Sequence, residues 1–303
     1  MEYRNIRKIA VLGAGTMGAY IAQFFASAGY QVSLYSRTQR TLERALALVR
    51  ETQEGAQALE RIQTYTEIAP ASASADWVIE TVAEDPEVKK LVLETADCYA
   101  PAGAFLTSDT SALNIFEFLE TGRPERVLIT HFFNPAAVMP LVEMVPGPQT
   151  DREAVACLRA FLEGVGKKPV VLKECIPGFL ANRLTLALAR EAYYLAGEGY
   201  ASIEDIDRVI TTTFGPRYVF EGIFDLYDYI GLDVGCAVAK DLLPQLCQDT
   251  EVPALLRDKV EAGELGVKTL KGLKDYTGMD ANVLRRERTK RIEEVFRRLS
   301  GLI

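Results

Sequence analysis

The first 175 residues alternate short apolar runs with longer stretches in which apolar residues recur every three or four positions. Seven such runs, rich in β-branched side chains, predict β-strands. They are KIAVLG, which ends at Gly13, QVSLYS (31–36), DWVIETV (76–82), AFLTS (104–108), VLITHFF (127–133), LVEMV (141–145) and PVVLK (169–173). Helical patterns follow the first run through Ala26 and recur at 86–100 and 151–165. Strands that alternate with helices predict βαβ units and a mainly parallel sheet.

The pattern changes after Pro177 and Gly178, because no further strand-like run follows them. Two amphipathic stripes predict long helices in this part of the chain. One stripe is Leu180, Leu184, Leu188, Ala192 and Leu195, and the other is Leu284, Ile292, Val295, Phe296 and Leu299. We therefore expect an α/β domain over residues 1–175 and an all-helical domain over residues 176–303. The basic segment RRERTKR (285–291) contains a glutamate, which favours a solvated helix face over a nucleic-acid patch.

Composition narrows the classes of partner. A length of 303 residues exceeds the usual size of one hydrophobic core and agrees with two domains. A net charge of -8 provides no attraction for nucleic acid or an anionic membrane, so neither is expected as a partner. Five scattered cysteines without a CxxC pair predict a reducing, cytoplasmic compartment. The same cysteines and a single histidine predict no transition-metal site.

A glycine-rich turn follows the first predicted strand and opens the first predicted helix. It reads Gly13-Ala14-Gly15-Thr16-Met17-Gly18, a GxGxxG element in the context typical of dinucleotide binding. The glycines allow a tight turn, a close approach of pyrophosphate to the backbone, and close packing of helix on strand. The unpaired amides of the helix then face the phosphates. We expect a Rossmann-type domain that binds NAD or NADP, with a glycine turn that binds nothing as the alternative.

The end of the second predicted strand distinguishes the two cofactors. An acidic residue there accepts hydrogen bonds from the ribose 2'-hydroxyl of NAD. This chain has Ser36 and Arg37 instead, with Arg40 close behind, which suits the 2'-phosphate of NADP. The alternative is that these are ordinary surface residues and that NAD binds without the acidic contact.

His131 is the only histidine of the chain, and it lies in the stretch LITHFFNPAAVMPLVE (128–143). A lone histidine is either a core residue or the one group that can exchange a proton near neutral pH. Oxidation of an alcohol by a nicotinamide requires that the hydroxyl proton be removed, and an imidazole suits that task. Both interpretations remain open on these residues alone.

Six segments, taken in their order and spacing, resemble the L-3-hydroxyacyl-CoA dehydrogenase family, in particular its 3-hydroxybutyryl-CoA dehydrogenases. The resemblance extends over almost the entire chain. The segments are VLGAGTMG, VIETVAEDPEVKK (78–90), SDTSALNI (108–115), LITHFFNPAAVMPLVEMV, IPGFLANRL (176–184) and FDLYDYIGLD (224–233).

The resemblance implies oxidation of a 3-hydroxyacyl-CoA to its 3-oxo form, with NAD as the usual cofactor. It implies His131 as general base, Glu143 as its orienting carboxylate, and Ser111 and Asn182 as hydrogen-bond partners of the substrate oxygen. It further implies cofactor contacts from Glu84 and Lys89, a substrate contact from Asn134, and a homodimer formed through the helical domain. From the residues alone, Ser111 and Asn182 could instead cap helices.

Several features depart from the family pattern and keep other substrates open. Only residues 37–75 separate the second and third predicted strands, fewer than the family usually has where it clamps CoA. Pro140 and Asp109 stand where the family tends to have lysine and asparagine. Arg217 resembles the arginine of gulonate and carnitine dehydrogenases and could bind a small carboxylate substrate, or it could be a surface residue. A non-catalytic, crystallin-like dinucleotide binder is a further alternative.

Overall fold

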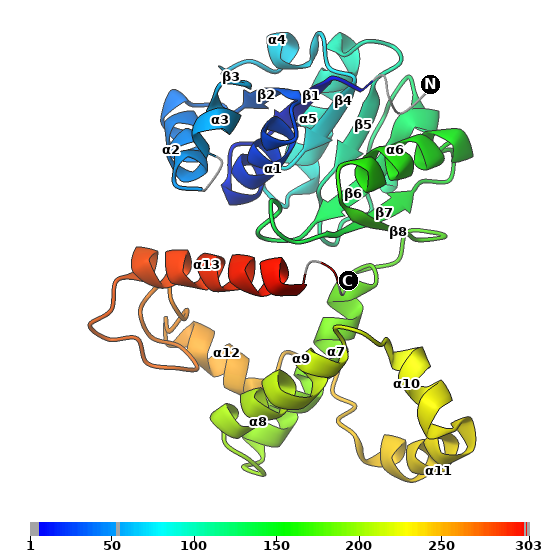
Figure 1. Cartoon of the computed structure of the whole chain (residues 1–303), viewed down its shortest axis with the longest axis vertical. Helices are drawn as coiled ribbons and strands as arrows, with labels where there is room; N and C mark the ends of the chain where they lie inside the picture. Colours follow the sequence, from blue (N-terminus) through cyan, green and yellow to red (C-terminus); the bar gives the residue numbers. More distant parts are fainter. Residues whose placement is uncertain (1–5, 53–54, 300, 302–303) are drawn as a thin grey trace. The chain divides into compact units, whose positions relative to one another are not determined.

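The computed structural model describes residues 6–52, 55–299 and 301. The chain divides into two compact units, residues 1–182 and residues 183–303, and each is described by itself (Figure 1). The predicted domain boundary after residue 175 lies shortly before this division and stays a prediction.

The first unit is built on one sheet of eight strands in the order β3-β2-β1-β4-β5-β6-β7-β8. Strands β1 to β6 run parallel, β7 is antiparallel to β6, and β8 is parallel to β7. The strands are β1 (Lys8–Leu12), β2 (Gln31–Tyr35), β3 (Ile62–Tyr65), β4 (Trp77–Glu80), β5 (Phe105–Ser108), β6 (Val127–Phe132), β7 (Leu141–Pro146) and β8 (Lys168–Val171). This confirms the mainly parallel Rossmann-type sheet.

One strand was not predicted from the sequence. The edge strand β3 has the sequence IQTY, and none of its four residues is fully buried. Because an edge strand pairs on one side only, its residues need not be continuously apolar. A short and half-polar run therefore gives little signal against the surrounding helices.

Helices cover both faces of the sheet, as Figure 1 shows. They are α1 (Thr16–Ser27), α2 (Gln39–Arg50), α3 (Gly55–Leu59), α4 (Ile68–Ser72), α5 (Pro86–Tyr99) and α6 (Arg152–Gly164), with short 3-10 turns η2 (Ile115–Glu117) and η3 (Pro124–Arg126). Alternate residues of a strand point to opposite faces. In β1, Ile9 and Val11 join the core under α1, α2 and α6, whereas Ala10 and Leu12 join the core under α4 and α5.

The carboxyl ends of the parallel strands meet at one edge of the sheet. Leu12 of β1 pairs with Glu80 of β4, and Glu80 pairs with Ser108 of β5. The residues that follow these strands therefore lie side by side at this edge, which is where open α/β sheets bind their ligands.

The second unit is helical, which confirms the predicted change of fold. It comprises most of α7 (Ala181–Gly197), then α8 (Ile203–Val209), the π-helical turn η4 (Ile210–Phe214), α9 (Gly215–Arg217), α10 (Ile223–Ile230), α11 (Leu232–Leu242), η5 (Leu243–Gln245), α12 (Ala254–Glu261) and α13 (Ala281–Leu299). Within the described residues, its only β-pairing consists of isolated bridges between Gly266 and Lys271 and between Lys271 and Asp275. No helix in the described part of the chain has the length and apolarity needed to cross a membrane.

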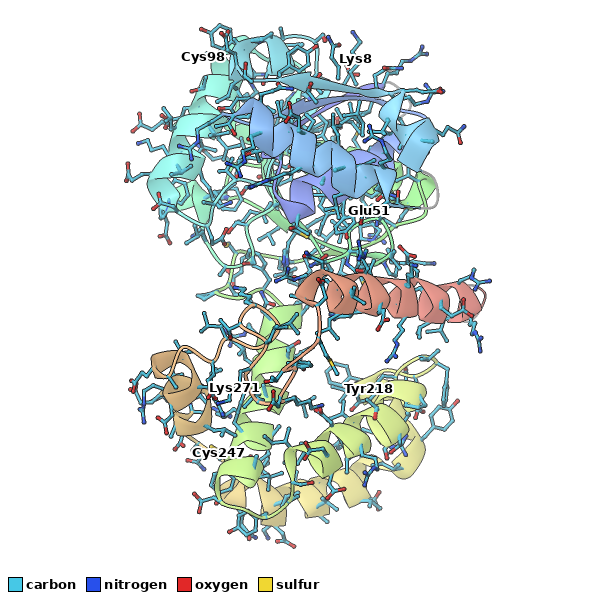
Figure 2. All side chains as sticks on the ribbon, turned by 90° about the vertical axis from the view of Figure 1, so that its left-hand side faces the viewer. Lys8, Glu51, Cys98, Tyr218, Cys247 and Lys271 are labelled. Carbon is cyan, nitrogen blue, oxygen red and sulfur yellow. The ribbon has the colours of Figure 1, made fainter. Side chains whose placement is uncertain are left out.

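The predicted apolar stripes of this unit are partly exposed, and none of their residues is fully buried. Leu184 and Leu188 of α7 are exposed, as is Val295 of α13. Cys247 is the only buried apolar side chain that the structure describes between residues 183 and 301. Many side chains extend outward from these helices (Figure 2).

Candidate active site

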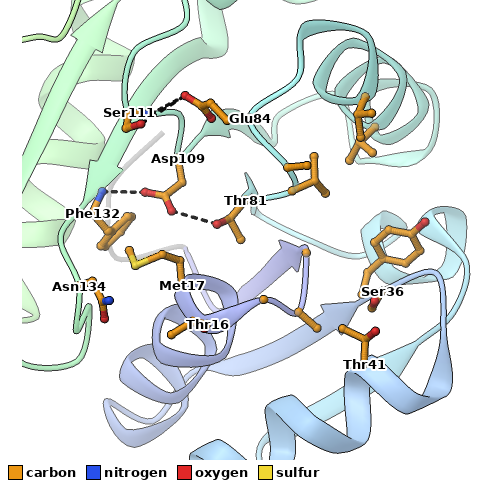
Figure 3. Close-up of a pocket in the computed structure, with 18 of the residues that line it drawn as sticks. Thr16, Met17, Ser36, Thr41, Thr81, Glu84, Asp109, Ser111, Phe132 and Asn134 are labelled. Atoms are coloured by element: carbon orange, nitrogen blue, oxygen red, sulfur yellow. Dashed lines mark hydrogen bonds between the residues drawn. The ribbon is translucent and has the colours of Figure 1, made fainter. Parts of the chain in front are cut away.

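A cavity of about 750 Å³ lies at the carboxyl edge of the sheet in the first unit (Figure 3). Eleven of the predicted site residues line it: Gly13, Gly15, Thr16, Met17, Ser36, Arg37, Glu84, Ser111, His131, Asn134 and Asn182. The cavity therefore collects the glycine turn, the cofactor-discriminating residues and the candidate base into one site.

The glycine turn has the geometry that a dinucleotide requires. Gly13 has φ +130, and an added Cβ would clash with the carbonyl oxygen of Thr81. A Cβ on Gly18 would clash with the carbonyl oxygen of Gly13, so Gly18 allows α1 to start directly against the turn. A Cβ on Gly15 would meet no atom within 4 Å, which leaves open space in front of its backbone. No side chain caps α1 at Gly15, so its first amides remain available to a phosphate group.

The adenosine end of the cavity is formed by the end of β2 and the start of α2. Ser36, Arg37, Thr38 and Thr41 line it. Thr38 caps α2 by accepting a hydrogen bond from the amide of Thr41. Among the described lining residues, the only carboxylates are Glu84 and Asp109, and both lie beyond strands β4 and β5. This end therefore presents hydroxyls and a guanidinium, and no carboxylate.

His131 and Glu143 form a buried pair across two antiparallel strands. The register of β6 and β7 places them directly opposite each other, and His131 Nδ1 lies 2.9 Å from Glu143 Oε2. His131 is 6% exposed and Glu143 is 1% exposed. Burial raises the pKa of Glu143, but hydrogen bonds from His131 and from the Ala181 and Leu180 amides outweigh it, so that the pKa lies below its ordinary value. An ionised Glu143 fixes the proton on Nδ1 and leaves Nε2 with a free lone pair.

The surroundings of His131 hold the ring in one orientation. Its ring centroid lies 4.4 Å from that of Phe133 and 5.7 Å from that of Phe179. Phe179 is fully buried and has a φ of 51, a backbone region that costs energy for a bulky residue. The second oxygen of Glu143 accepts hydrogen bonds from the amides of Leu180 and Ala181 at the start of α7. The pair is thus fixed both by the sheet and by the α7 terminus.

Ser111 lies in a loop that Glu84 organises. Oε1 of Glu84 accepts hydrogen bonds from Thr110 Oγ1 at 2.5 Å and from the Ser111 amide at 3.0 Å, and Ser111 Oγ lies 3.4 Å from it. Figure 3 shows Ser111 and Glu84 facing each other on the cavity wall. Asn182 Nδ2 donates to the carbonyl of Ser111 at 3.0 Å. Asn182 and Ser111 therefore support each other at the cavity.

Lys89 lies outside the lining of the cavity, and its predicted contact with the cofactor stays a prediction. The resemblance implies a contact with the cofactor ribose, but Lys89 is 1% exposed and does not line the cavity. Its Nζ lies 2.9 Å from Glu80 and 3.2 Å from Glu84. Its single positive charge lies between two carboxylates behind the cavity wall, because a buried ammonium needs close counter-charges.

Asp109 lines the cavity, although the sequence marks it only as a departure from the family. Its Oδ1 accepts a hydrogen bond from the Phe132 amide at 2.7 Å, and its Oδ2 accepts one from Thr81 Oγ1 at 3.0 Å (Figure 3). Burial nevertheless raises the pKa of Asp109 to about 8. Its place directly after β5 could have suggested a site residue, since ligands bind at the carboxyl ends of parallel strands.

Lys167 fixes the loop between the two strands of the His131–Glu143 pair. It is 3% exposed, and its Nζ donates to the carbonyls of Ala136 and Met139 in that loop. The same Nζ lies 3.9 Å from the ring centroid of Phe24 in α1. Burial lowers the pKa of Lys167 to about 7. No sequence motif drew attention to this lysine.

Two residues were predicted to contact substrate. Asn134 lines the cavity beside Phe133. Arg217 belongs to the second unit, where its Nε lies 3.5 Å from Glu221 Oε1 one helical turn later. A role for Arg217 at the cavity stays a prediction.

Comparisons with known proteins show the family to which the chain belongs. Residues 8–175 match the model of the 3-hydroxyacyl-CoA dehydrogenase NAD binding domain, and residues 178–276 match the model of the C-terminal domain of the same family. The chain is 31% identical to 5-formyl-3-hydroxy-2-methylpyridine 4-carboxylate 5-dehydrogenase from Mesorhizobium japonicum, over 98% of this chain and 99% of the relative.

Many solved structures are similar to the chain, and two of them differ in the substrate that their names give. One is a 5-formyl-3-hydroxy-2-methylpyridine 4-carboxylic acid 5-dehydrogenase described as an NAD+ dependent dismutase, with a TM-score of 0.89, 30% identity, and coverage of 98% of this chain and 100% of that chain. The other is (S)-3-hydroxybutyryl-CoA dehydrogenase from Ralstonia eutropha, with a TM-score of 0.71, 32% identity, and coverage of 90% and 100%. The chain belongs to the 3-hydroxyacyl-CoA dehydrogenase family, and it is an NAD(P)-dependent oxidoreductase that acts on CH-OH groups.

Proposed function

We propose that the chain oxidises a carbinol carbon with His131 as the general base and Glu143 as its orienting partner. The buried His131–Glu143 pair at the cavity carries this proposal, because Glu143 occupies Nδ1 and leaves Nε2 to accept the substrate proton. The nicotinamide, when bound, accepts the hydride that leaves the same carbon. Glu143 stabilises the imidazolium that forms, as acidic partners do in other histidine pairs.

Ser111 and Asn182 hold the reacting oxygen in this proposal. A hydroxyl both donates and accepts hydrogen bonds, so Ser111 suits an oxygen that changes from alcohol to carbonyl. Glu84 keeps the Ser111 loop in place through three contacts to Ser111 and Thr110. Phe133 and Phe179 limit the access of water to the base, because both rings contact that of His131.

The first candidate substrate is a 3-hydroxyacyl-CoA such as 3-hydroxybutyryl-CoA, which is oxidised to the 3-oxo thioester. Membership of the family and the structural similarity to the Ralstonia enzyme support it. The same site residues are those that the family pattern assigns to this reaction.

The second candidate is a compact carboxylate-bearing hydroxy compound or hydrated aldehyde. A hydrated formyl group presents the same H–C–O–H unit as a secondary alcohol, so His131 would act on it in the same way. Two observations favour this candidate. Among its described residues, the segment between β2 and β4 holds only α2, α3, β3 and α4, and the pyridine-carboxylate enzyme resembles the chain over nearly its whole length.

A substrate screen with both cofactors separates the candidates. The panel is (S)-3-hydroxybutyryl-CoA, free 3-hydroxybutyrate and 5-formyl-3-hydroxy-2-methylpyridine 4-carboxylate, monitored at the reduced-nicotinamide absorbance band. Saturation by the CoA ester with a KM in the micromolar range would support the first candidate and contradict the second. Tight cofactor binding with neither an absorbance change nor product formation for any of the three would contradict both and favour a non-catalytic binder.

We infer a preference for NADP over NAD from the adenosine end. Arg37 can pair with a 2'-phosphate, and no described carboxylate at that end is available to a 2'-hydroxyl. Arg37→Ala is expected to weaken NADPH binding about tenfold and NADH binding less than about twofold. Fluorescence titration of both reduced cofactors measures this, with Arg44→Ala as an arginine control that does not line the cavity. Catalytic efficiency that is higher with NAD than with NADP in the unaltered chain would contradict the preference.

We propose that the second unit forms a homodimer. Its helices expose large apolar side chains, including Leu186 of α7 and Phe224 and Tyr229 of α10, the last two at 86% and 85%. A surface that exposes several large apolar side chains is typical of an interface with another chain. Light scattering is expected to give twice the mass of the 33.5 kDa chain. Leu186→Arg should shift the mass toward one chain, whereas the exposed polar control Glu198→Arg should not; a monomeric unaltered chain would contradict the dimer.

A further inference from the structure

Asp109 brings a carboxylate to the part of the cavity that holds the candidate base. It follows β5 directly and shares the cavity wall with His131, Ser111 and Asn182, whereas Ser36 and Arg37 line the adenosine end. A dinucleotide that lies across the glycine turn with its adenosine at Ser36 has its nicotinamide at the Asp109 end. Figure 3 shows Asp109 between Thr81 and the backbone of Phe132.

The hydrogen bonds of Asp109 favour its ionised form. Both oxygens accept, one from the Phe132 amide and one from Thr81 Oγ1, and a carboxylate is an acceptor at both positions. These bonds fix the carboxylate in place, so it cannot turn away when the charge in the cavity changes.

The charged groups around Asp109 come from several elements. Glu80 at the end of β4 opposes its ionisation, whereas Lys89 of α5 favours it. Glu84 and His131 also line or border this part of the cavity. Lys89 is already paired with Glu80 and Glu84, so the three groups together leave one excess negative charge before Asp109 ionises.

The oxidised nicotinamide ring carries one positive charge and the reduced ring carries none. We propose that Asp109 is a specificity-determining residue for the redox state of the cofactor, and that its carboxylate binds the oxidised nicotinamide in preference to the reduced one. The positive ring supplies the counter-charge that Asp109 lacks in the free protein. Beside a reduced, neutral ring, Asp109 would take up a proton from solvent, which forms its O–H bond and leaves the carboxyl group uncharged.

The inference rests on the proposed function, because it requires a nicotinamide in this cavity. Two unit charges about 10 Å apart at an effective dielectric constant of about 20 correspond to about a tenfold change in affinity. By linkage, the bound oxidised cofactor lowers the pKa of Asp109 by about one unit from its value of about 8 in the free protein. Affinity for the oxidised form therefore rises with pH through this window and is constant above it.

The test measures dissociation constants of NAD+ and NADH, or of NADP+ and NADPH if these bind more tightly, from pH 6 to 9.5 by calorimetry. All variants carry His131→Gln, so that no imidazole titrates in the cavity. With Asp109 intact, the ratio of oxidised to reduced affinity is expected to rise about tenfold in total across this pH range, most steeply between about pH 7 and pH 8. Asp109→Asn keeps one acceptor and one donor at the site and should make the ratio independent of pH.

Ser36→Ala is the matched control, because it lies at the adenosine end and should change both affinities equally. A ratio that does not vary with pH while Asp109 is intact overturns the inference, whether or not the asparagine variant folds. Failure of both redox forms to bind the protein at all would instead contradict the proposed function. The two failures are therefore distinguishable in the same titrations.

Discussion

His131→Ala is expected to lower kcat by between about a hundredfold and ten-thousandfold. The hydroxyl proton then has no imidazole to accept it in the cavity, because His131 is the only histidine, and Glu143 is 1% exposed behind it. The dissociation constant of the cofactor should change less than about threefold, since the glycine turn that binds the pyrophosphate is untouched. Stopped-flow measurement of the hydride step with the best substrate of the screen, together with cofactor titration, gives both values.

The Glu143→Gln variant tests the role of Glu143 in orienting His131 separately from its role in folding. The amide can still accept from the α7 amides of Leu180 and Ala181, but it no longer stabilises an imidazolium. We expect a loss in kcat smaller than that of His131→Ala, and a pH profile whose acidic limb moves toward lower pH, because the carboxylate that stabilises the protonated base is gone. A His131→Ala protein that retains more than about a tenth of the original kcat would remove His131 from the reaction.

The pairing of His131 with Glu143 illustrates what the sequence could predict. Both residues lie in strongly apolar runs separated by a loop, so their strands were identifiable. The sequence alone did not indicate that β7 turns back antiparallel to β6, with these two residues in register. Their pairing came from the family resemblance, and the strand register now supplies its physical basis.

The sequence could not predict which charged side chains are buried and which charged groups lie next to them. Lys89 follows the start of a charged helix, where a lysine is usually solvated, yet it is buried between Glu80 and Glu84. Asp109 and Lys167 have altered pKa values because distant elements surround them, and no local motif records that burial. The surroundings of such groups are known only from the fold, which brings segments about thirty residues apart into contact, as with Lys167 and Ala136.

The apolar stripes of the second unit were predicted as helix faces, and helices do form there. A periodic stripe predicts that a face must be covered, but not which surface covers it. Leu184, Leu188 and Val295 are exposed on this chain. Because these side chains are exposed on the single chain, a measurement of the protein's mass in solution tests the proposed homodimer.

We expect Gly15→Ala to weaken cofactor binding and Gly18→Ala to destabilise the fold. Measuring both properties tests the dinucleotide site without an activity assay. A Cβ at Gly15 meets no protein atom within 4 Å, so the fold should lose only the modest preference for glycine over alanine at a helix N-cap, about 1 kcal/mol. The same Cβ occupies the space that a pyrophosphate must approach. Cofactor affinity is therefore expected to fall about a hundredfold, the equivalent of about 3 kcal/mol.

The Cβ of Gly18→Ala would collide with the carbonyl oxygen of Gly13 and press on the Thr81 side chain. Because backbone cannot move aside as a flexible side chain does, we expect a loss of about 3 kcal/mol in the free energy of unfolding and a fall of about 10 °C in Tm. Calorimetric melting of both variants and cofactor titration of each distinguish the two effects. Equal loss of stability in the two variants would show that Gly15 serves only the turn, whereas selective loss of cofactor binding by Gly15→Ala locates the pyrophosphate at its backbone.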